Sequence, residues 1–513
     1  VTKELAEAKE LQLDQLDCSG SLPLSGYFKV SRQFTILESC NITADRRGAT
    51  LFLEAPLHFN ESVEFHGNLS VIAVRQPLDG PCVILEKDGI VQPGAELRFA
   101  NCHRKRDEDI LTLGSLGGAM FVHRNLFIHG DLHIRNCSAY SAGAIYVGET
   151  FTQSNGAVTI ENSWSAKRGG AIFVRNNFTQ SDGTLTIENS SAKSDGGAIL
   201  VENTFTQSNG TVTIENTSAE VGGAIYVKNT FTQSDGTVTI KNSSATTDGG
   251  AIFVLENFTQ SDGTLTIANS LARMEGGAIF VHRNCAQLNG TLTIANSLAE
   301  ENGGAIYVKN TFTQSDGTVT IENASAKYGG AIYVDSTFTQ SRGTLTIANS
   351  LAKGSAGAIF VDTFTQSDGT LTIENSSVRM EGGAIYVFKN FTQSGGTLKI
   401  ANSLAKGSAG AIYVKNNFTQ SDGTLTIANS LAKLTGGAMW IKGNFTANKG
   451  TLSIRNATGK SGGGMQVGGD VVLVDAAVSF HQCHAQEDGG GIRAFGNVDA
   501  TNTTLLFVRS TTD

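Results

Sequence analysis

The sequence predicts an all-β fold, a right-handed, three-sided parallel β-helix in which each repeat makes one coil of a solenoid. Two observations support this prediction. A small-Gly-Ala signature returns at intervals of 26 or 27 residues, and the unit between two signatures holds three short strand-like runs without helical periodicity. The glycine at the second position of the signature recurs at Gly118, Gly143, Gly170, Gly197, Gly223, Gly250, Gly277, Gly304, Gly330, Gly357, Gly383, Gly410, Gly437, Gly463 and Gly490.

A typical unit, residues 169–195, reads GGAIFVRNNFTQSDGTLTIENSSAKSD. The runs AIFV, FTQS and TLTI have strand character, and Asn, Asp-Gly and Gly-Gly turn signals separate them. Left-handed β-helices usually have six-residue sides, which this period does not fit, and parallel crossovers are right-handed. Each coil should therefore rise by one strand spacing, about 4.8 Å.

We divide the chain into four regions. Residues 1–17 form an N-terminal helix or cap, because residues 3–16 have helical composition and an open solenoid end needs cover. Residues 18–115 form irregular coils stapled by cysteines, residues 116–465 the regular repeats, and residues 466–513 degenerate C-terminal coils.

Alternation along each strand assigns side chains to the core or to the outside. In TLTI, Leu185 and Ile187 face inward, and in FTQS the phenylalanines form an inward column that only Cys285 interrupts. The asparagine after TLTI has two interpretations, a glycan acceptor or a hydrogen-bonded ladder between coils. Copies that read NSL or NSW lose the glycosylation signal but keep the asparagine, which favours the ladder.

The central residue of the AIFV run should face outward, and it is aromatic on nearly every coil. Thr and Ser occupy the outward positions of the other two sides, so β propensity does not explain why this side alone is aromatic. A strand that is apolar on both faces is usually buried on both faces, which predicts a partner here. The expected partner-binding residues are Phe121, Tyr146, Phe173, Tyr226, Phe253, Phe280, Tyr307, Tyr333, Phe360, Tyr386, Tyr413 and Trp440, with Leu200 as the single aliphatic member.

Sequons and cysteines suggest a secreted chain. Asn-x-Ser/Thr sequons are dense, and we expect N-glycans at Asn177, Asn257, Asn390, Asn417 and Asn444. Of the seven cysteines, Cys102 and Cys137 both follow a turn asparagine one coil apart, which favours a Cys102–Cys137 bridge. A Cys18–Cys40 bridge is the second expectation.

Composition argues against several function classes. A net charge of −9 with 17% charged residues gives no electrostatic footprint for nucleic acid or for an anionic membrane. No apolar run approaches the length of a membrane span, and no CxxC pair suggests zinc or redox chemistry. We expect no metal and no cofactor.

The pairing of GGAI at residues 196–199 with IENSSA at residues 187–192 resembles the polymorphic outer membrane protein repeats of chlamydial surface adhesins. The resemblance extends over roughly residues 115–495, and it implies a right-handed β-helix with pectate-lyase-like topology, exported and displayed at a surface. This chain uses Ile or Val where that family's FxxN usually begins with Phe.

These observations predict an extracellular or cell-surface scaffold, not an enzyme, that associates laterally or end to end through its outward aromatic ladder. The partner is a protein, a second copy, or a polysaccharide. One alternative is an ice- or crystal-binding protein that uses the outward Thr-x-Thr of TLTI. That ladder comprises Thr184, Thr211, Thr237, Thr264, Thr291, Thr318, Thr344, Thr370 and Thr424, interrupted by Lys399 and Ser453. A polysaccharide lyase or hydrolase is the other alternative. It is disfavoured because the acidic residues recur in turns, where Asp182 and its counterparts suit turn chemistry.

Overall fold

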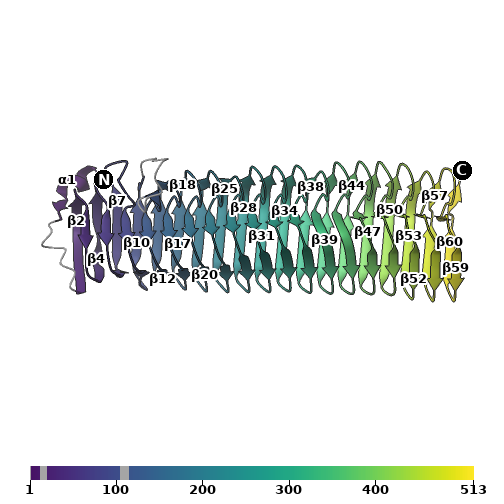
Figure 1. Cartoon of the computed structure of the whole chain (residues 1–513), viewed down its shortest axis with the longest axis horizontal. Helices are drawn as coiled ribbons and strands as arrows, with labels where there is room; N and C mark the ends of the chain where they lie inside the picture. Colours follow the sequence, from purple (N-terminus) through teal and green to yellow (C-terminus); the bar gives the residue numbers. More distant parts are fainter. Residues whose placement is uncertain (1, 12–19, 104–114) are drawn as a thin grey trace. The chain divides into compact units, whose positions relative to one another are not determined.

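The computed structural model describes residues 2–11, 20–103 and 115–513. It confirms an all-β parallel solenoid with coils of about 27 residues. The chain divides into two compact units, which we call the N-terminal unit (residues 1–246 and 250–255) and the C-terminal unit (residues 247–249 and 256–513). Within each unit the strands stack as successive coils (Figure 1).

The N-terminal helix is shorter than the sequence suggests. Helix α1 spans only Thr2–Glu7, and strand β1 (Lys9–Glu10) follows it. Strand β1 pairs in parallel with β2 (Gly20–Val30), so that Lys9 lies opposite Phe28. Within the described residues the expected helix over residues 3–16 is wrong at Lys9–Glu10, because the free backbone edge of β2 recruits these residues as a strand; the rest of the expected helix, residues 12–16, lies outside the described residues.

The irregular coils of the N-terminal unit are β-solenoid coils, as predicted. Their strands are β3 (Phe34–Ile36), β4 (Cys40–Leu53), β5 (Leu57–Phe59), β6 (Val63–His66), β7 (Asn68–Ala73), β8 (Val83–Leu85), β9 (Gly89–Val91) and β10 (Glu96–Ala100). Strands β2, β4, β7 and β10 pair in that order, and β10 continues onto β13 (Asp131–Arg135) of the regular repeats.

Each regular coil has three strand runs and a short fourth segment after the turn asparagine, and on several coils neighbouring runs join into one strand, as in β25 (Thr211–Ala219). In the N-terminal unit one coil consists of β19 (Ile172–Val174), β20 (Phe178–Gln180), β21 (Thr184–Glu188) and β22 (Ser191–Ala192). In the C-terminal unit one coil consists of β35 (Ile306–Val308), β36 (Thr311–Gln314), β37 (Thr318–Glu322) and β38 (Ser325–Ala326). Each strand pairs with its counterpart on the next coil without a shift in register over most of the repeats, so equivalent side chains lie in columns.

The phenylalanine column lies in the core of each unit, as the alternation predicts. In the N-terminal unit, Phe151, Phe178 and Phe205 stack with ring centroids 4.7–4.8 Å apart and no exposed surface. In the C-terminal unit, Cys285 on β33 (Asn284–Gln287) takes the ring position and lies in register with Phe312. Burying each ring contributes roughly 1.5–3 kcal/mol.

A second core column, formed by the glutamine of FTQ, was not predicted from the sequence. Its side chain is fully buried and hydrogen-bonded along the column. Gln180 Nε2 donates to Gln153 Oε1 at 3.2 Å and to the Thr211 carbonyl of the following coil at 3.2 Å. Buried amides are stable only with such partners. The period-2 pattern already placed this residue inward, and its recurrence was the signal for a ladder.

The turn asparagines form the predicted ladder. In the C-terminal unit, Nδ2 of Asn349 donates to Oδ1 of Asn323 at 3.2 Å, and Asn375 donates to Asn349 at 3.0 Å. The same residues adopt left-handed backbone conformations, with φ between 53° and 55°. Asparagine tolerates this region better than most residues, which is a second reason for its recurrence.

Two turn positions depend on particular residues. Asp182 Oδ1 accepts a hydrogen bond from the N–H of Gly183, which supports the turn role predicted for the repeated aspartates. A Cβ on Gly330 would lie 2.1 Å from the Gly357 carbonyl oxygen, so the signature glycine permits adjacent coils to approach.

The predicted Cys102–Cys137 bridge is wrong. Cys102 bonds to Cys82 with a Cα–Cα distance of 5.9 Å, and Cys137 is a buried free thiol. Cys102 and Cys137 do occupy equivalent positions, since Ala100 pairs with Arg135 in register. Cys82, however, occupies the position that the signature alanine has on later coils, and Ala119 is its counterpart on the next coil. This position lies across a corner of the coil from Cys102. Cys40 is disulfide-bonded, and its expected partner Cys18 lies outside the described residues.

Candidate interaction surfaces

The aromatic ladder faces away from the main core but is largely buried. Eight of its thirteen members are at most 8% exposed, with Phe121 at 2% and Tyr413 at 1%. The half-buried members are Tyr226, Tyr333, Phe360, Tyr386 and Trp440. The expectation of a continuous exposed strip that requires a partner is therefore wrong for the buried members.

The chain itself covers the ladder. In the N-terminal unit, Phe121, Tyr146, Phe173 and Leu200 form a second hydrophobic cluster with Ala142, and Leu116 packs against it. Leu116 and Ala142 belong to the corner segments that precede the next aromatic strand. Strand alternation assigns a side chain to a face, but it does not reveal that a corner segment folds over that face.

Polar groups close the ladder at its hydroxyl ends. Tyr307 donates a 2.6 Å hydrogen bond to Asp335 Oδ2, and burial together with this carboxylate raises the pKa of the phenol. Burial likewise raises the pKa of Tyr146, against the opposing effect of Arg175. These two hydroxyls are thus neutral at physiological pH, and that of Tyr307 already has a partner within the fold.

The most accessible stretch of the ladder lies in the C-terminal unit. Tyr333, Phe360 and Tyr386 are consecutive and half-buried, and their ring centroids are 4.7 Å and 4.8 Å apart. They lie on β39 (Ile332–Gln340), β42 (Ile359–Gln366) and β45 (Ile385–Val387). Partner binding by the ladder stays a prediction, and these three half-buried rings are the consecutive ladder members that a partner can reach.

The five expected glycan acceptors lie along one edge of the coils. Asn390, Asn417 and Asn444 are exposed, whereas Asn177 and Asn257 are half-buried. Each Oδ1 accepts a hydrogen bond from the neighbouring coil, for example from the Asn444 N–H to Asn417 at 2.9 Å. Among the described residues, Nδ2 of Asn390, Asn417 and Asn444 donates no hydrogen bond, so the nitrogen that would carry a glycan remains free.

The outward threonines form the predicted columns on the third side of the coil. In the C-terminal unit, Thr318, Thr344 and Thr370 pair in register on adjacent strands, and a parallel column lies two residues further along. Lys399 interrupts that second column between Thr372 and Thr426.

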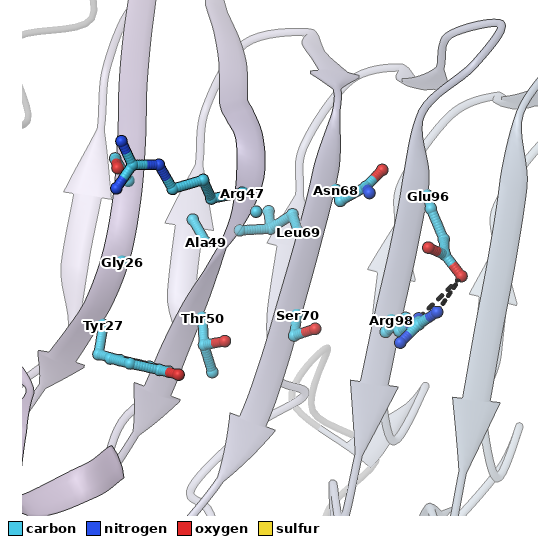
Figure 2. A pocket seen from close by; sticks show the side chains of 12 residues that line it. Gly26, Tyr27, Arg47, Ala49, Thr50, Asn68, Leu69, Ser70, Glu96 and Arg98 are labelled. Carbon is cyan, nitrogen blue, oxygen red and sulfur yellow. Dashed lines mark hydrogen bonds and ion pairs between the residues drawn. The ribbon is translucent and has the colours of Figure 1, made fainter.

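The same side of the N-terminal unit is charged and hollowed. Figure 2 shows Tyr27, Thr50, Ser70 and Arg98 in a row across adjacent strands. They border a shallow hollow of about 470 Å³. Arg98 is paired with Glu96, which also lies 3.4 Å from His133. The hollow therefore holds one ion pair, Glu96–Arg98, beside the exposed Arg47 guanidinium, and its polar lining is suited to hydrogen bonding with a polar ligand.

The segment after the turn asparagine was not among the surfaces predicted from the sequence. In the C-terminal unit this segment carries exposed leucines, among them Leu271, Leu298 and Leu351 at 40–49% exposure. Five repeats read IANSL where others read IENSS, so that Ala and Leu replace Glu and Ser, first at Ala268 and Leu271. This pattern in the sequence was the signal for an apolar outer surface.

No helix among the described residues is long and apolar enough to cross a membrane. Over the same residues, no three His, Cys, Asp or Glu side chains are grouped as metal ligands.

Comparison of the chain with models of protein families, with curated proteins and with solved structures finds no match in any of the three.

Proposed function

We propose that this chain is a structural and adhesive scaffold of an extracellular surface. The observation that carries the proposal is the register of the coils. Outward positions such as Thr318, Thr344 and Thr370 repeat at one strand spacing, so a contact made by one coil can be made by its neighbours. Repetition of this kind suits attachment over an extended surface better than chemistry at a single point.

Hydrogen-bonded ladders give the scaffold its rigidity. The buried glutamine ladder links Gln314, Gln340 and Gln366, and the ladder of partly exposed asparagines links Asn323, Asn349 and Asn375, in addition to the backbone pairing. The glutamines lie in a low-dielectric interior, where such a network strengthens its members and specifies one register. A body built in this way holds its outward side chains at fixed spacing.

Extracellular display rests on the glycan acceptors and on the resemblance to chlamydial surface repeats. Asn390, Asn417 and Asn444 are exposed with a free amide nitrogen, and we place N-glycans there. The GGAI and IENSSA motifs that carry the resemblance fall on structural positions of the coil, namely the corner glycines and the asparagine ladder. The resemblance therefore supports the fold more directly than it supports adhesion.

Lateral association is assigned to the half-buried rings of Tyr333, Phe360 and Tyr386. These rings form one stacked strip, and aromatic side chains are enriched at protein interfaces. A partner that covers them gains apolar burial at little cost in side-chain entropy, because stacking already orders the rings.

Sedimentation velocity of the full chain, secreted from a eukaryotic host, tests the proposal. Replacement of Tyr333, Phe360 and Tyr386 by Ser should convert an associating species into a monomer, with an unchanged far-UV circular dichroism spectrum. The matched control replaces the outward Thr339 and Thr365 of the same strands by Ser and should associate normally. A wild-type chain that stays monomeric and carries no mass removable by peptide N-glycosidase would contradict the proposal.

A second candidate function, ice or crystal binding, is favoured by the two registered threonine columns of the C-terminal unit. Regularly spaced hydroxyls and methyls on a sheet can order water or match a crystal face. Thermal hysteresis of the full chain tests this candidate, with Thr344 and Thr370 replaced by Lys as the disabling change. The natural interruption at Lys399 shows that the fold accepts lysine in these columns.

A further inference from the structure

In the C-terminal unit, exposed apolar side chains form a line that the ladder prediction did not include. The position two residues after the turn asparagine, which we call the leucine position, carries Leu271, Leu298, Leu351 and Leu431, which are 40–49% exposed. Register places them in one column with the half-buried Leu404 and with Ser325 and Ser377. These strands are β31 (Thr264–Ala272), β34 (Thr291–Ala299), β38, β41 (Leu351–Ala352), β44 (Ser377–Val378), β47 (Thr397–Ala405) and β50 (Thr424–Ala432).

A second column, apolar in part, runs beside the first, and Glu301, Gly354 and Gly407 occupy it on three coils. Three residues after the leucine position lie Met274, Met380 and Leu434, each 49–51% exposed. Backbone hydrogen bonds join this position from coil to coil, for example from the Leu434 N–H to the Gly407 carbonyl at 3.0 Å. Met380 stands on the coil where the leucine position is Ser377, so the second column supplies an apolar side chain where the first lacks one.

Between the two apolar columns lies a column of cations. Two residues after the leucine position are Arg273, Lys353, Arg379, Lys406 and Lys433, all exposed. In the part of the chain that the structure describes, none of these five cations forms an ion pair. We call the two apolar columns and this basic column the leucine–cation stripe.

Two coils of the same column depart from the basic pattern. One carries the exposed Glu300, and the next carries Lys327, which pairs with Glu301 at 2.7 Å. The net charge of −9 averages over the whole chain and conceals the local positive charge at Lys353, Lys406 and Lys433, whereas Glu275 and Glu381 follow Arg273 and Arg379 two residues later. The corresponding leucine position of the N-terminal unit holds mainly serine, including Ser191, Ser218 and Ser244. The stripe is therefore a feature of the C-terminal unit.

We propose that the leucine–cation stripe binds the surface of an anionic lipid bilayer. Side chains that combine exposed aliphatic groups with adjacent Lys and Arg suit the headgroup zone, where apolar groups enter the acyl boundary and cations meet phosphate or carboxylate groups. Mobile lipid headgroups can move to cations spaced one per coil. The charges also argue against a second copy, because two stripes face to face would oppose like charges.

The chemistry distinguishes lipid from a soluble polyanion. An anionic polysaccharide would use the cations but would leave the exposed Leu and Met side chains in water. An acidic amphipathic polypeptide could use both, yet its charges would have to match the coil repeat, whereas a fluid bilayer has no repeat to match. This proposal does not rest on the scaffold function, because it concerns other residues and a different partner.

Co-sedimentation of the full chain with vesicles tests the proposal. One set of vesicles contains phosphatidylcholine alone, and the other an equimolar mixture of phosphatidylcholine and phosphatidylserine. The wild-type chain should bind the mixed vesicles and not the neutral ones, with weaker binding as salt is raised. Replacement of Lys353, Lys406 and Lys433 by Gln should lower the partition coefficient roughly 100-fold, at about fivefold for each cation near an anionic surface.

The second variant replaces Leu351, Leu404 and Leu431 by Ser, the residue that Ser325 and Ser377 already supply in this column. It should bind the mixed vesicles at least about 30-fold more weakly while its circular dichroism and thermal unfolding match the wild type.

The matched control replaces Lys309, Lys415 and Lys442 by Gln, which are exposed cations at another corner of the same unit. This control makes the same change in net charge and should bind as the wild type does. The proposal is overturned if the wild type fails to bind the mixed vesicles, including the case in which it binds only an acidic peptide. It is also overturned if the control loses as much binding as the stripe variants.

Discussion

Replacing one glutamine of the buried ladder tests whether these ladders hold the coils together. Gln340 is fully buried, and its Nε2 donates to Gln314 Oε1 and to the Thr370 carbonyl, each at 3.1 Å. Its Oε1 accepts from Gln366 Nε2 at 2.9 Å. Changing Gln340 to Ala removes three hydrogen bonds and leaves Gln314 Oε1 without its donor.

The expected loss follows from two terms. A buried acceptor left without a partner costs about 1–3 kcal/mol. The space vacated by the amide adds about 1 kcal/mol, because the rings and strands around it relax only in part. We therefore expect Gln340→Ala to lower the local free energy of unfolding by about 3 kcal/mol. Gln340→Leu fills the space but still leaves Gln314 Oε1 unpaired, so it should cost about 2 kcal/mol.

Native-state hydrogen exchange is the appropriate assay. In a solenoid each coil contacts only its neighbours, so global unfolding is not assured to be two-state. The amides of β39, β42 and β43 (Thr370–Glu374) report opening of the affected coils. The control Thr339→Ala changes an outward neighbour on the same strand and should cost less than about 0.5 kcal/mol. If Gln340→Ala and Thr339→Ala exchange alike, the ladder is not what stabilises the coil.

Three further outcomes are expected. Ala119→Cys should form a disulfide with Cys137 in the geometry of the native bridge one coil earlier, seen as the loss of the Cys137 thiol to alkylation in the unfolded chain. Burial raises the pKa of the Cys285 thiol to about 12, so in the native chain it should resist Ellman's reagent at pH 8. Because the folded thiol keeps its proton where the unfolded thiol has lost it, this burial should make the free energy of unfolding fall as pH rises above about 9. Ser350→Ala should leave stability unchanged or raise it by up to about 1 kcal/mol in guanidinium unfolding, because its buried hydroxyl has no hydrogen-bond partner among the residues that the structure describes and Ala324 already occupies the same column.

The repeat itself made most of the fold predictable from sequence. A period of 26 or 27 residues with three strand-like runs leaves one parallel coil per unit, and strand alternation then placed the Phe151 column inside. The asparagine ladder that includes Asn323 was predictable because repeats that lack the sequon still have the asparagine. Each of these features depends only on how residues are spaced along the chain, and that spacing can be read directly from the sequence.

The surfaces were harder to predict because exposure depends on what covers a residue. Phe173 points away from the main core as expected, yet it is 8% exposed because corner segments and stacked neighbours enclose it. Leu351 was overlooked because the segment after the turn asparagine is only two residues long and shows no periodicity of its own. The Cys82–Cys102 bridge joins two corners of one coil, which repeat alignment alone does not bring together.

Seven coils of the C-terminal unit, from the one with Leu271 to the one with Leu431, fall into two kinds that share one interior. Five coils read Ala-Asn-Ser-Leu, as at residues 348–351, and two read Glu-Asn-x-Ser, as at residues 322–325. In both kinds the isoleucine before the motif is buried and the asparagine joins the ladder, so neither the core nor the ladder distinguishes them. The differences that all seven coils share lie at the two outward positions, where Ala348 and Leu351 replace Glu322 and Ser325. Each such exchange removes an exposed carboxylate and adds an exposed aliphatic group beside the cation column. Folding does not require that difference, so its recurrence on five coils is better explained by what the outer surface contacts.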